Sequence, residues 1–184
     1  MAILPIYTYG DQVLKKTAKP LKGVDAKTRK LITDMFETME QASGIGLAAP
    51  QVGVSIRLLV IDVSIIEKYE EIPPMVFINP QILEADGLFT MEEGCLSIPG
   101  VRETVTRPDR IKLKYRDENF NEHIEEFDGL VSRVIQHELD HLNGELFVEK
   151  LDSKLKKAHK DELEAILRGD AEAEYVLAEK SLTV

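Results

Sequence analysis

His137 and His141 stand four residues apart, with Glu138 directly after the first histidine. Because residues four apart lie on the same face of a helix, both imidazoles can hold one metal ion, and the glutamate stays available for proton transfer. Only four histidines occur in 184 residues, so this spacing is a specific signal. A catalytic metal site of this type usually has three protein ligands and one position for water. The identity of the third ligand therefore decides the class of enzyme.

The residues around the two histidines predict a buried helix that ends shortly after them. Asp128 is a candidate N-cap, and Asn143 followed by Gly144 supplies the left-handed residue that commonly closes a helix. An alternative is a pair of core histidines bonded to backbone carbonyls, with the glutamate facing solvent. The helical stripe and its flank are apolar except for the histidines: Leu130, Val134, His137 and His141, beside Val131, Ile135 and Leu142.

Three places in the chain are candidates for the third ligand. The metzincin pattern is followed through Gly144, but its next ligand position is Phe147, which cannot bind a metal, so that class is excluded. A gluzincin-like site would use Glu162 or Glu164 from the charged segment near the C-terminus. The third candidate is Cys95, the only cysteine, because a thiolate binds soft and borderline metal ions well.

The surroundings of Cys95 favour a functional role over that of a small buried hydrophobic residue. Gly94 allows close approach of the backbone, and residues 97–100 read as a turn, so the cysteine is expected at the end of an extended segment. No second cysteine is present for a disulfide. Without a signal peptide or a membrane-spanning apolar run, we expect a cytoplasmic, reduced protein in which a thiolate ligand persists.

Three stretches, taken together and in this order, resemble the signature motifs of the peptide deformylase family, bacterial type. They are Gly-Ile-Gly-Leu-Ala-Ala-Pro-Gln at residues 44–51, Glu-Gly-Cys-Leu-Ser at 93–97 and Gln-His-Glu-Leu-Asp-His at 136–141. Alone, the first stretch is equally compatible with a tight turn before a strand. The resemblance covers about residues 1–155. It implies an enzyme that removes the N-formyl group from the formylmethionine of newly synthesised proteins, an amide hydrolase rather than a peptidase.

The resemblance also implies the metal centre. The family's metal ligands fall on Cys95, His137 and His141, and its general acid/base falls on Glu138. Ligand types alone would suggest zinc. The family generally works with ferrous iron, so we expect one Fe²⁺ per chain, with Zn²⁺ or Ni²⁺ substituting readily in purified protein.

The remaining motif residues are expected to stabilise the transition state and to line the substrate. By resemblance, the Gln51 side chain and the Leu96 backbone N–H stabilise the oxyanion, while Ile45, Gly46 and Gly94 contact the substrate. The chemistry agrees, because a metal ion with an open position lowers the pKa of water towards neutrality, and a neighbouring glutamate can take and return its proton. Two residues on the histidine face of the helix offer an apolar wall for the methionine side chain: Leu130 and Val134.

Length and patterning predict one α+β domain spanning residues 1–184. Asp25 should cap a first helix with an apolar stripe, and short strands are expected at residues 57–63, 75–79, 110–115 and 122–127. A last helix is expected from Ser153 to Arg168, its inward face formed by Leu155, Leu163, Ile166 and Leu167. We expect antiparallel sheets packed around the central metal-binding helix, with an N-terminal and a C-terminal helix. Residues 156–184 hold the C-terminal helix and a divergent tail.

Charge gives weaker indications about partners. A formal net charge of -10 argues against binding nucleic acid through bulk electrostatics, and no sequence-specific nucleic-acid contact is expected. A structural metal site remains an alternative, with His123 or His159 as a fourth ligand. One basic cluster is either a solvated face or, by resemblance, a transient contact with the ribosome through the C-terminal helix: Lys150, Lys154, Lys156, Lys157 and Lys160.

Overall fold

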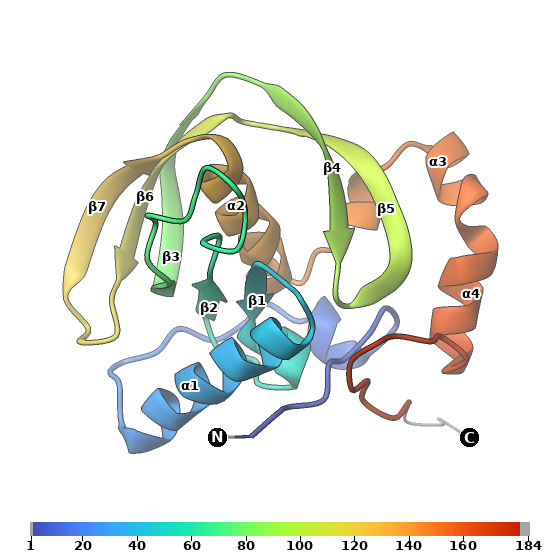
Figure 1. The fold of residues 1–184 in the computed structure, drawn as a ribbon, viewed down its shortest axis with the longest axis horizontal. Helices are drawn as coiled ribbons and strands as arrows, with labels where there is room; N and C mark the ends of the chain where they lie inside the picture. The colour runs from blue at the N-terminus through green and yellow to red at the C-terminus, as the bar shows by residue number, and fades with distance from the viewer. Residues whose placement is uncertain (1, 181–184) are drawn as a thin grey trace.

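Five antiparallel strands form the central sheet of this α+β fold (Figure 1). The structure is a computed structural model that describes residues 2–180. The sheet has the order β1-β2-β3-β6-β7, with bounds Gly46–Ala48, Leu58–Ile61, Met75–Asp86, Arg110–Arg116 and Glu122–Phe127. Two further strands, β4 (Phe89–Cys95) and β5 (Ile98–Arg107), form a separate antiparallel hairpin. The α+β class and the antiparallel pairing expected from the sequence are confirmed.

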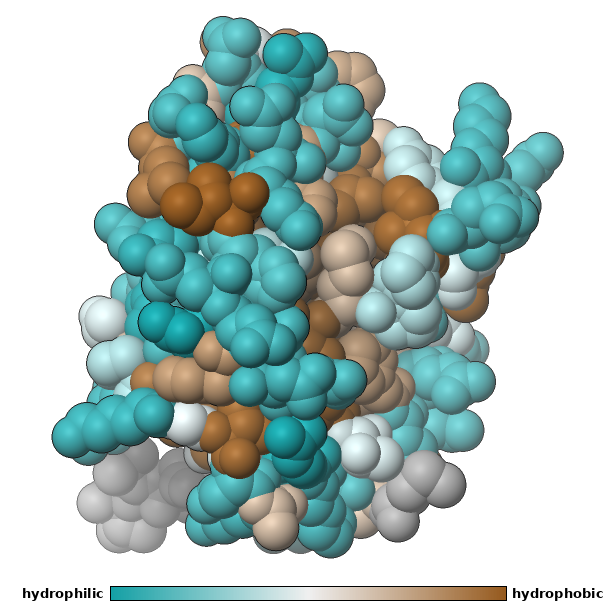
Figure 2. Space-filling view, turned by 90° about the vertical axis from the view of Figure 1, so that its left-hand side faces the viewer, coloured by the Kyte–Doolittle hydropathy of each residue, from teal (hydrophilic) through white to brown (hydrophobic). Residues whose placement is uncertain are grey.

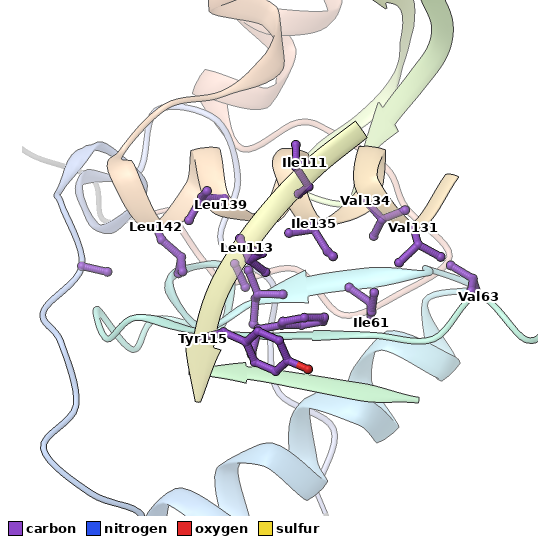
Figure 3. Close-up of a cluster of buried hydrophobic side chains, with 14 residues drawn as sticks. Ile61, Val63, Ile111, Leu113, Tyr115, Val131, Val134, Ile135, Leu139 and Leu142 are labelled. Carbon is purple, nitrogen blue, oxygen red and sulfur yellow. The ribbon is translucent and has the colours of Figure 1, made fainter. Parts of the chain in front are cut away.

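Two helices cover opposite faces of the central sheet. Strand β2 is buried on both sides: Leu59 and Ile61 face one apolar cluster, while Leu58 and Val60 face another. Helix α2 (Gly129–Asn143) packs in the first cluster and α1 (Ala26–Gln41) in the second. Figure 3 shows the first cluster, in which α2 side chains meet those of β2 and β6: Val131, Val134, Ile135, Leu139, Leu142, Ile61, Ile111, Leu113 and Tyr115. This packing fixes α2 against the sheet.

The start of α1 and both ends of α2 lie where the sequence predicted them. The Asp25 carboxylate accepts a hydrogen bond from the Thr28 N–H at 2.8 Å, which confirms the predicted cap of α1. Gly144, at φ 79°, closes α2 as predicted. Asp128 occupies the N-cap position of α2, as predicted, although its side chain makes no capping hydrogen bond.

Strand β3 is longer than the sequence predicted. The expected end at Asn79 is a bulge, because Asn79 has φ 52° and the register with β6 shifts between Ile78 and Gln81. The Asn79 side chain bonds the backbone N–H and carbonyl of Leu21, which fixes the bulge. Pro80 has no N–H for the hydrogen bonds between strands, so the sequence predicts that the strand ends there, whereas in the structure it continues.

The β4–β5 hairpin was predicted only in part. Cys95 does lie at the end of a strand, as expected, but the turn consists of Leu96 and Ser97 rather than residues 97–100. Residues 98–100 already belong to β5. The hairpin therefore presents Cys95 next to a two-residue loop.

The expected last helix is two helices, α3 (Ser153–Ala158) and α4 (Lys160–Arg168). His159 stands between them, and its Nε2 lies 2.8 Å from Glu103 Oε1 of β5, so the break ties the helices to the hairpin. The break changes which residues face inward: Ile166 is buried, whereas Leu167 is 49% exposed and was wrongly placed in the core.

The segment after α4 runs back beside the N-terminal segment (Figure 1). Ile6 and Leu177 form a parallel bridge, so the segment after α4 returns to the start of the chain. The face in Figure 2 is mainly hydrophilic, with hydrophobic residues in separate groups. No helix within residues 2–180 is both long and apolar enough to cross a membrane.

Candidate metal centre and its pocket

Three side chains from two elements converge on one point. Cys95 ends β4, while His137 and His141 lie on the last turns of α2. Their donor atoms all lie within 4.8 Å of one another, and Cys95 Sγ is 3.2 Å from His141 Nε2. Two donors on one tetrahedral zinc ion would be about 3.5 Å apart, given metal–sulfur and metal–nitrogen distances near 2.3 and 2.0 Å. One sulfur and two imidazole nitrogens therefore fit a single borderline metal ion.

Two contacts outside the donor cluster orient the His137 ring. Its Nδ1 lies 2.9 Å from the Glu93 carboxylate, which leaves Nε2 free to face the site. Its ring packs against Phe147, with 5.9 Å between the ring centroids. Phe147 occupies the position where a metzincin would have its third histidine, and here it supports the first one.

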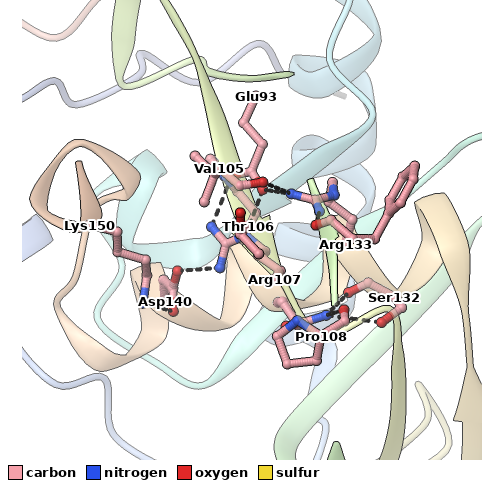
Figure 4. A network of polar contacts seen from close by, with 12 residues as sticks. Glu93, Val105, Thr106, Arg107, Pro108, Ser132, Arg133, Asp140 and Lys150 are labelled. Atoms are coloured by element: carbon pink, nitrogen blue, oxygen red, sulfur yellow. Dashed lines mark hydrogen bonds and ion pairs between the residues drawn. The ribbon is translucent and has the colours of Figure 1, made fainter. Parts of the chain in front are cut away.

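Glu93 is the centre of a buried ion network (Figure 4). It pairs with Arg107 and Arg133, each with a nitrogen 2.6 Å from Glu93 Oε1, and all three side chains are at most 5% exposed. Burial by itself would raise the pKa of Glu93, but hydrogen bonds from His137 and Arg107 outweigh it and lower the pKa to about 2. Glu93 is therefore a carboxylate at neutral pH and holds His137 in place.

Arg107 extends this network towards the C-terminal end of α2. Its Nη1 lies 2.8 Å from Asp140 Oδ2, and Asp140 in turn lies 3.3 Å from Lys150 Nζ (Figure 4). Arg133 also donates to the backbone carbonyls of Phe89 and Val105 in the hairpin. The sequence analysis gave Arg107, Arg133 and Asp140 no role. The available signal was Arg133, a charge one helical turn before His137 on a stripe that is otherwise apolar.

Glu138 is buried beside the three donor atoms, and its Oε2 has no hydrogen-bond partner among residues 2–180. Burial raises the pKa of Glu138 to about 7, against the opposing effect of His137 and Arg107. Gly46 makes room for it: a Cβ on Gly46 would lie 2.7 Å from Glu138 Oε1 and 2.7 Å from Val134 Cγ1. A carboxyl group with a pKa near neutrality can both accept and return a proton.

The Gln51 side chain is held in one orientation next to Cys95. Its Oε1 accepts from the Ala48 N–H at 2.8 Å, so the amide nitrogen must point the other way. That nitrogen donates to Ser97 Oγ at 3.2 Å and lies 3.8 Å from Cys95 Sγ. Gln51 thus presents a fixed donor at the edge of the donor cluster.

A pocket of about 510 Å³ opens onto this cluster. Its wall includes Cys95, His137 and Glu138, together with Tyr175 from the C-terminal segment, which the sequence analysis did not consider. Every residue predicted to line the substrate is also part of the wall, as is Leu96: Ile45, Gly46, Gly94, Leu130 and Val134. Gln51 lies behind the wall, in contact with the donor cluster.

The alternative ligands lie elsewhere. Glu162 and Glu164 belong to α4, and neither is in the donor cluster found among residues 2–180; Glu164 pairs with Lys160 instead. His123 is engaged by Asp117 at 2.9 Å and His159 by Glu103. In the described part of the chain the cluster thus has three protein donors, and neither His123 nor His159 serves as a fourth, as in a metal centre of the hydrolytic type.

Comparison with known proteins places the chain in a family. Residues 3–157 match the family model of polypeptide deformylase, and the chain belongs to that family. Peptide deformylases of Chlorobium luteolum and Chlorobaculum tepidum are 59% and 53% identical over 176 residues, 96% of this chain and 93% and 94% of those proteins. The recognition made from the three motifs is therefore confirmed. The matched length also reaches beyond residue 157, into the C-terminal tail.

Solved structures agree with this assignment. A peptide deformylase from Legionella pneumophila superposes with a TM-score of 0.83 at 40% identity, covering 91% of this chain and 96% of that one. One from Synechococcus elongatus, in complex with actinonin, gives 0.80 at 42% identity, covering 95% and 92%. The fold described above is thus that of solved peptide deformylases.

Proposed function

We propose that this chain is a metal-dependent hydrolase that removes the N-formyl group from the N-terminal formylmethionine of newly synthesised polypeptides. The observation that carries the proposal is the convergence of Cys95, His137 and His141 beside the buried Glu138, whose Oε2 has no hydrogen-bond partner among residues 2–180. Membership in the polypeptide deformylase family supports the choice of substrate. The bond broken is the formyl amide at the chain terminus, so the enzyme acts on a linear amide and is not a peptidase.

We assign the metal ligands to Cys95, His137 and His141, and the metal in the cell to Fe²⁺. A bound divalent ion would supply a Lewis acid and lower the pKa of water at this point in the pocket. The mixed sulfur and nitrogen donor set also accepts Zn²⁺ and Ni²⁺, which we expect to replace iron readily in purified protein. Glu93 contributes by holding the His137 ring in the orientation that leaves Nε2 available.

Glu138 is proposed as the general acid/base. Its unpartnered Oε2 can take the proton of the attacking water, and the resulting carboxylic acid can give that proton to the departing amine nitrogen. The products are formate and a free α-amino group, so atoms and charge balance.

Gln51 and Leu96 are proposed to stabilise the oxyanion. Attack on the formyl carbon places negative charge on its oxygen, and donors fixed in advance stabilise that charge without reorganisation. The Gln51 amide nitrogen is held towards Cys95 by the bond from Ala48 to its oxygen. The Leu96 N–H follows Cys95 directly in the hairpin loop.

The pocket wall is proposed to select formylmethionine. Leu130 and Val134 offer an apolar surface to the methionine side chain, while Ile45, Gly46 and Gly94 line the route of its backbone. A formyl carbon carries only hydrogen, so it can approach a crowded centre that would reject the methyl group of an acetyl amide.

The proposed substrate is made on ribosomes, so we place the enzyme in the cytoplasm and propose a transient ribosome contact through α3 and α4. Four lysines of these helices are exposed: Lys154, Lys156, Lys157 and Lys160. Lys160 is partly neutralised by Glu164. Because the net charge of the whole chain is -10, such a contact would be local.

Formate release from formyl-Met-Ala by the iron-loaded chain, compared with Glu138→Gln, tests the function. We expect the variant to keep its metal and to lose turnover by a factor on the order of a hundred or more, because only proton transfer is removed. Glu162→Ala, on α4, is the matched control and should behave like the parent. Absence of formate release from the parent would refute the function, and loss of metal together with rate in Glu138→Gln would refute the role assigned to Glu138.

A further inference from the structure

The C-terminal segment, residues 170–180, is fastened to the N-terminal segment. The Ile6 N–H donates to the Val176 carbonyl at 2.9 Å, and the Ala178 N–H donates to the Ile6 carbonyl at 2.8 Å. The end of the segment is held by Lys180 Nζ, which donates to backbone carbonyls and to a carboxylate of one loop: Thr8, Tyr9 and Asp11. This segment therefore has a defined course past the N-terminus (Figure 1).

Tyr175 carries the contact between this segment and the candidate site. Its hydroxyl donates to the Leu96 carbonyl at 2.8 Å, and its side chain lines the main pocket. It also lines a second cavity of about 230 Å³, which shares Ser43 and Pro99 with the main pocket. Tyr175 thus reaches the hairpin loop from a part of the chain 79 residues away.

The loop that Tyr175 contacts is held mainly from outside the hairpin. Cys95 pairs with Ile98, so only Leu96 and Ser97 form the loop. The turns usual in such short loops need positive φ, which neither residue has. Instead, the Ser97 carbonyl accepts from the Tyr9 N–H at 2.8 Å, and Ser97 Oγ accepts from Gln51. Tyr175 provides the remaining bond, to the Leu96 carbonyl.

We propose that Tyr175 is a positioning residue for the reaction: by holding the Leu96 carbonyl, its hydroxyl orients the Leu96 N–H towards the substrate oxygen. The inference rests on the proposed function, in which that N–H stabilises the oxyanion. Cys95 is fixed by strand pairing on one side of Leu96, and the carbonyl is fixed by Tyr175 on the other. The backbone between these two points has little freedom to rotate, so the N–H direction is set before substrate binds.

The test is Tyr175→Phe in the full, iron-loaded chain, with formyl-Met-Ala as substrate. The ring that lines the pocket remains and only the hydroxyl is lost. We expect kcat to fall on the order of tenfold, less than the 10²–10³ typical of losing an oxyanion donor outright, with KM changed by less than about threefold. Metal content and melting temperature should match the parent. Tyr7→Phe is the matched control, since Tyr7 is not among the residues that line the main pocket.

Lys180→Ala provides an independent arm, because Lys180 anchors the segment without lining the pocket. Lys180→Ala should lower kcat by less than Tyr175→Phe does. The double variant should be no slower than Tyr175→Phe alone, since both substitutions act through the hydrogen bond from Tyr175 to the Leu96 carbonyl. Unchanged kcat in Tyr175→Phe, or a raised KM with kcat intact, would overturn the positioning role while the parent still releases formate. A parent that releases no formate would instead refute the proposed function.

Discussion

Glu93 makes several buried contacts that its place in the sequence motif does not predict. Its one buried carboxylate orients His137, pairs with two arginines and joins β4 to β5 and α2. A buried ion pair adds little stability compared with a hydrophobic substitute, but removing one partner leaves the other charges buried and unpaired. Glu93 is therefore expected to matter for folding as well as for the metal site.

Glu93→Gln should lower the free energy of unfolding by about 3–5 kcal/mol, because Arg107 and Arg133 would lose their buried counter-charge. Urea unfolding of the metal-free protein at pH 7 measures this. Glu92→Gln is the matched control: Glu92 pairs with Arg102 at the surface, so its loss should cost no more than about 1 kcal/mol. Equal losses in the two variants would contradict the account of the network.

The same variant should alter the response to acid. The pKa of Glu93 is lowered from 4.5 to about 2, so the folded protein binds fewer protons at this site than the unfolded chain between these values. Its stabilising contribution is complete above about pH 4.5 and is lost as the pH falls towards 2. The difference in stability between the parent and Glu93→Gln should therefore shrink over this range.

The donor residues could be predicted from the sequence because their chemistry is local to short motifs. The spacing of His137 and His141 on one helix face follows from helical geometry. Cys95 could be nominated by its neighbours but not placed, since its distance to the histidines depends on how the hairpin docks on α2. Arg107 and Tyr175 could not be foreseen, because their contacts join segments far apart in sequence.

Strand β1 lies close against α2 at Gly46. A Cβ at this position would lie within 2.7 Å of both Glu138 and Val134, so the strand can lie against the turn of α2 that carries Glu138 only if residue 46 has no side chain. The motif glycine is thus explained by contact between two elements.

Gly46→Ala should push α2 side chains away from β1. We expect a loss of about 1–3 kcal/mol in stability from overpacking. Turnover should drop on the order of tenfold or more, since a displacement of the order of 1 Å can cost a hundredfold. Thermal unfolding and formate release measure the two effects. Gly23→Ala, where a Cβ would meet nothing within 4 Å, is the control. Full activity in Gly46→Ala would show that the close contact is not required.

The boundaries of helices and strands were predicted correctly where neighbouring residues determine them. They were missed where a contact with a residue distant in sequence determines them. Asp25 and Gly144 end their helices through local hydrogen bonds, and both were read correctly. The bulge at Asn79 depends on Leu21, and the break at His159 depends on Glu103. Neither partner is near in sequence, so a continuous helix and a short strand were the natural but wrong expectations.

At the scale of the whole molecule, the fold brings one hairpin, one helix and the segment after α4 to a single pocket. The hairpin supplies Cys95, the helix supplies the histidines and Glu138, and the C-terminal segment closes one side with Tyr175. That residues 1–184 form one domain stays a prediction. In the proposed function, buried charged side chains orient the proposed metal ligands, and the apolar part of the pocket wall contacts the substrate.

We propose that formyl amides are hydrolysed in this pocket. A comparison of a formyl and an acetyl substrate tests this proposal. Initial rates on formyl-Met-Ala and acetyl-Met-Ala should be measured with the iron-loaded chain kept from oxygen. We expect the formyl peptide to be cleaved faster by about tenfold or more, because the acetyl peptide carries one added methyl group that must enter a crowded centre. Equal rates on the two peptides would contradict deformylation as the function, even if the chain proved to be a metal-dependent hydrolase.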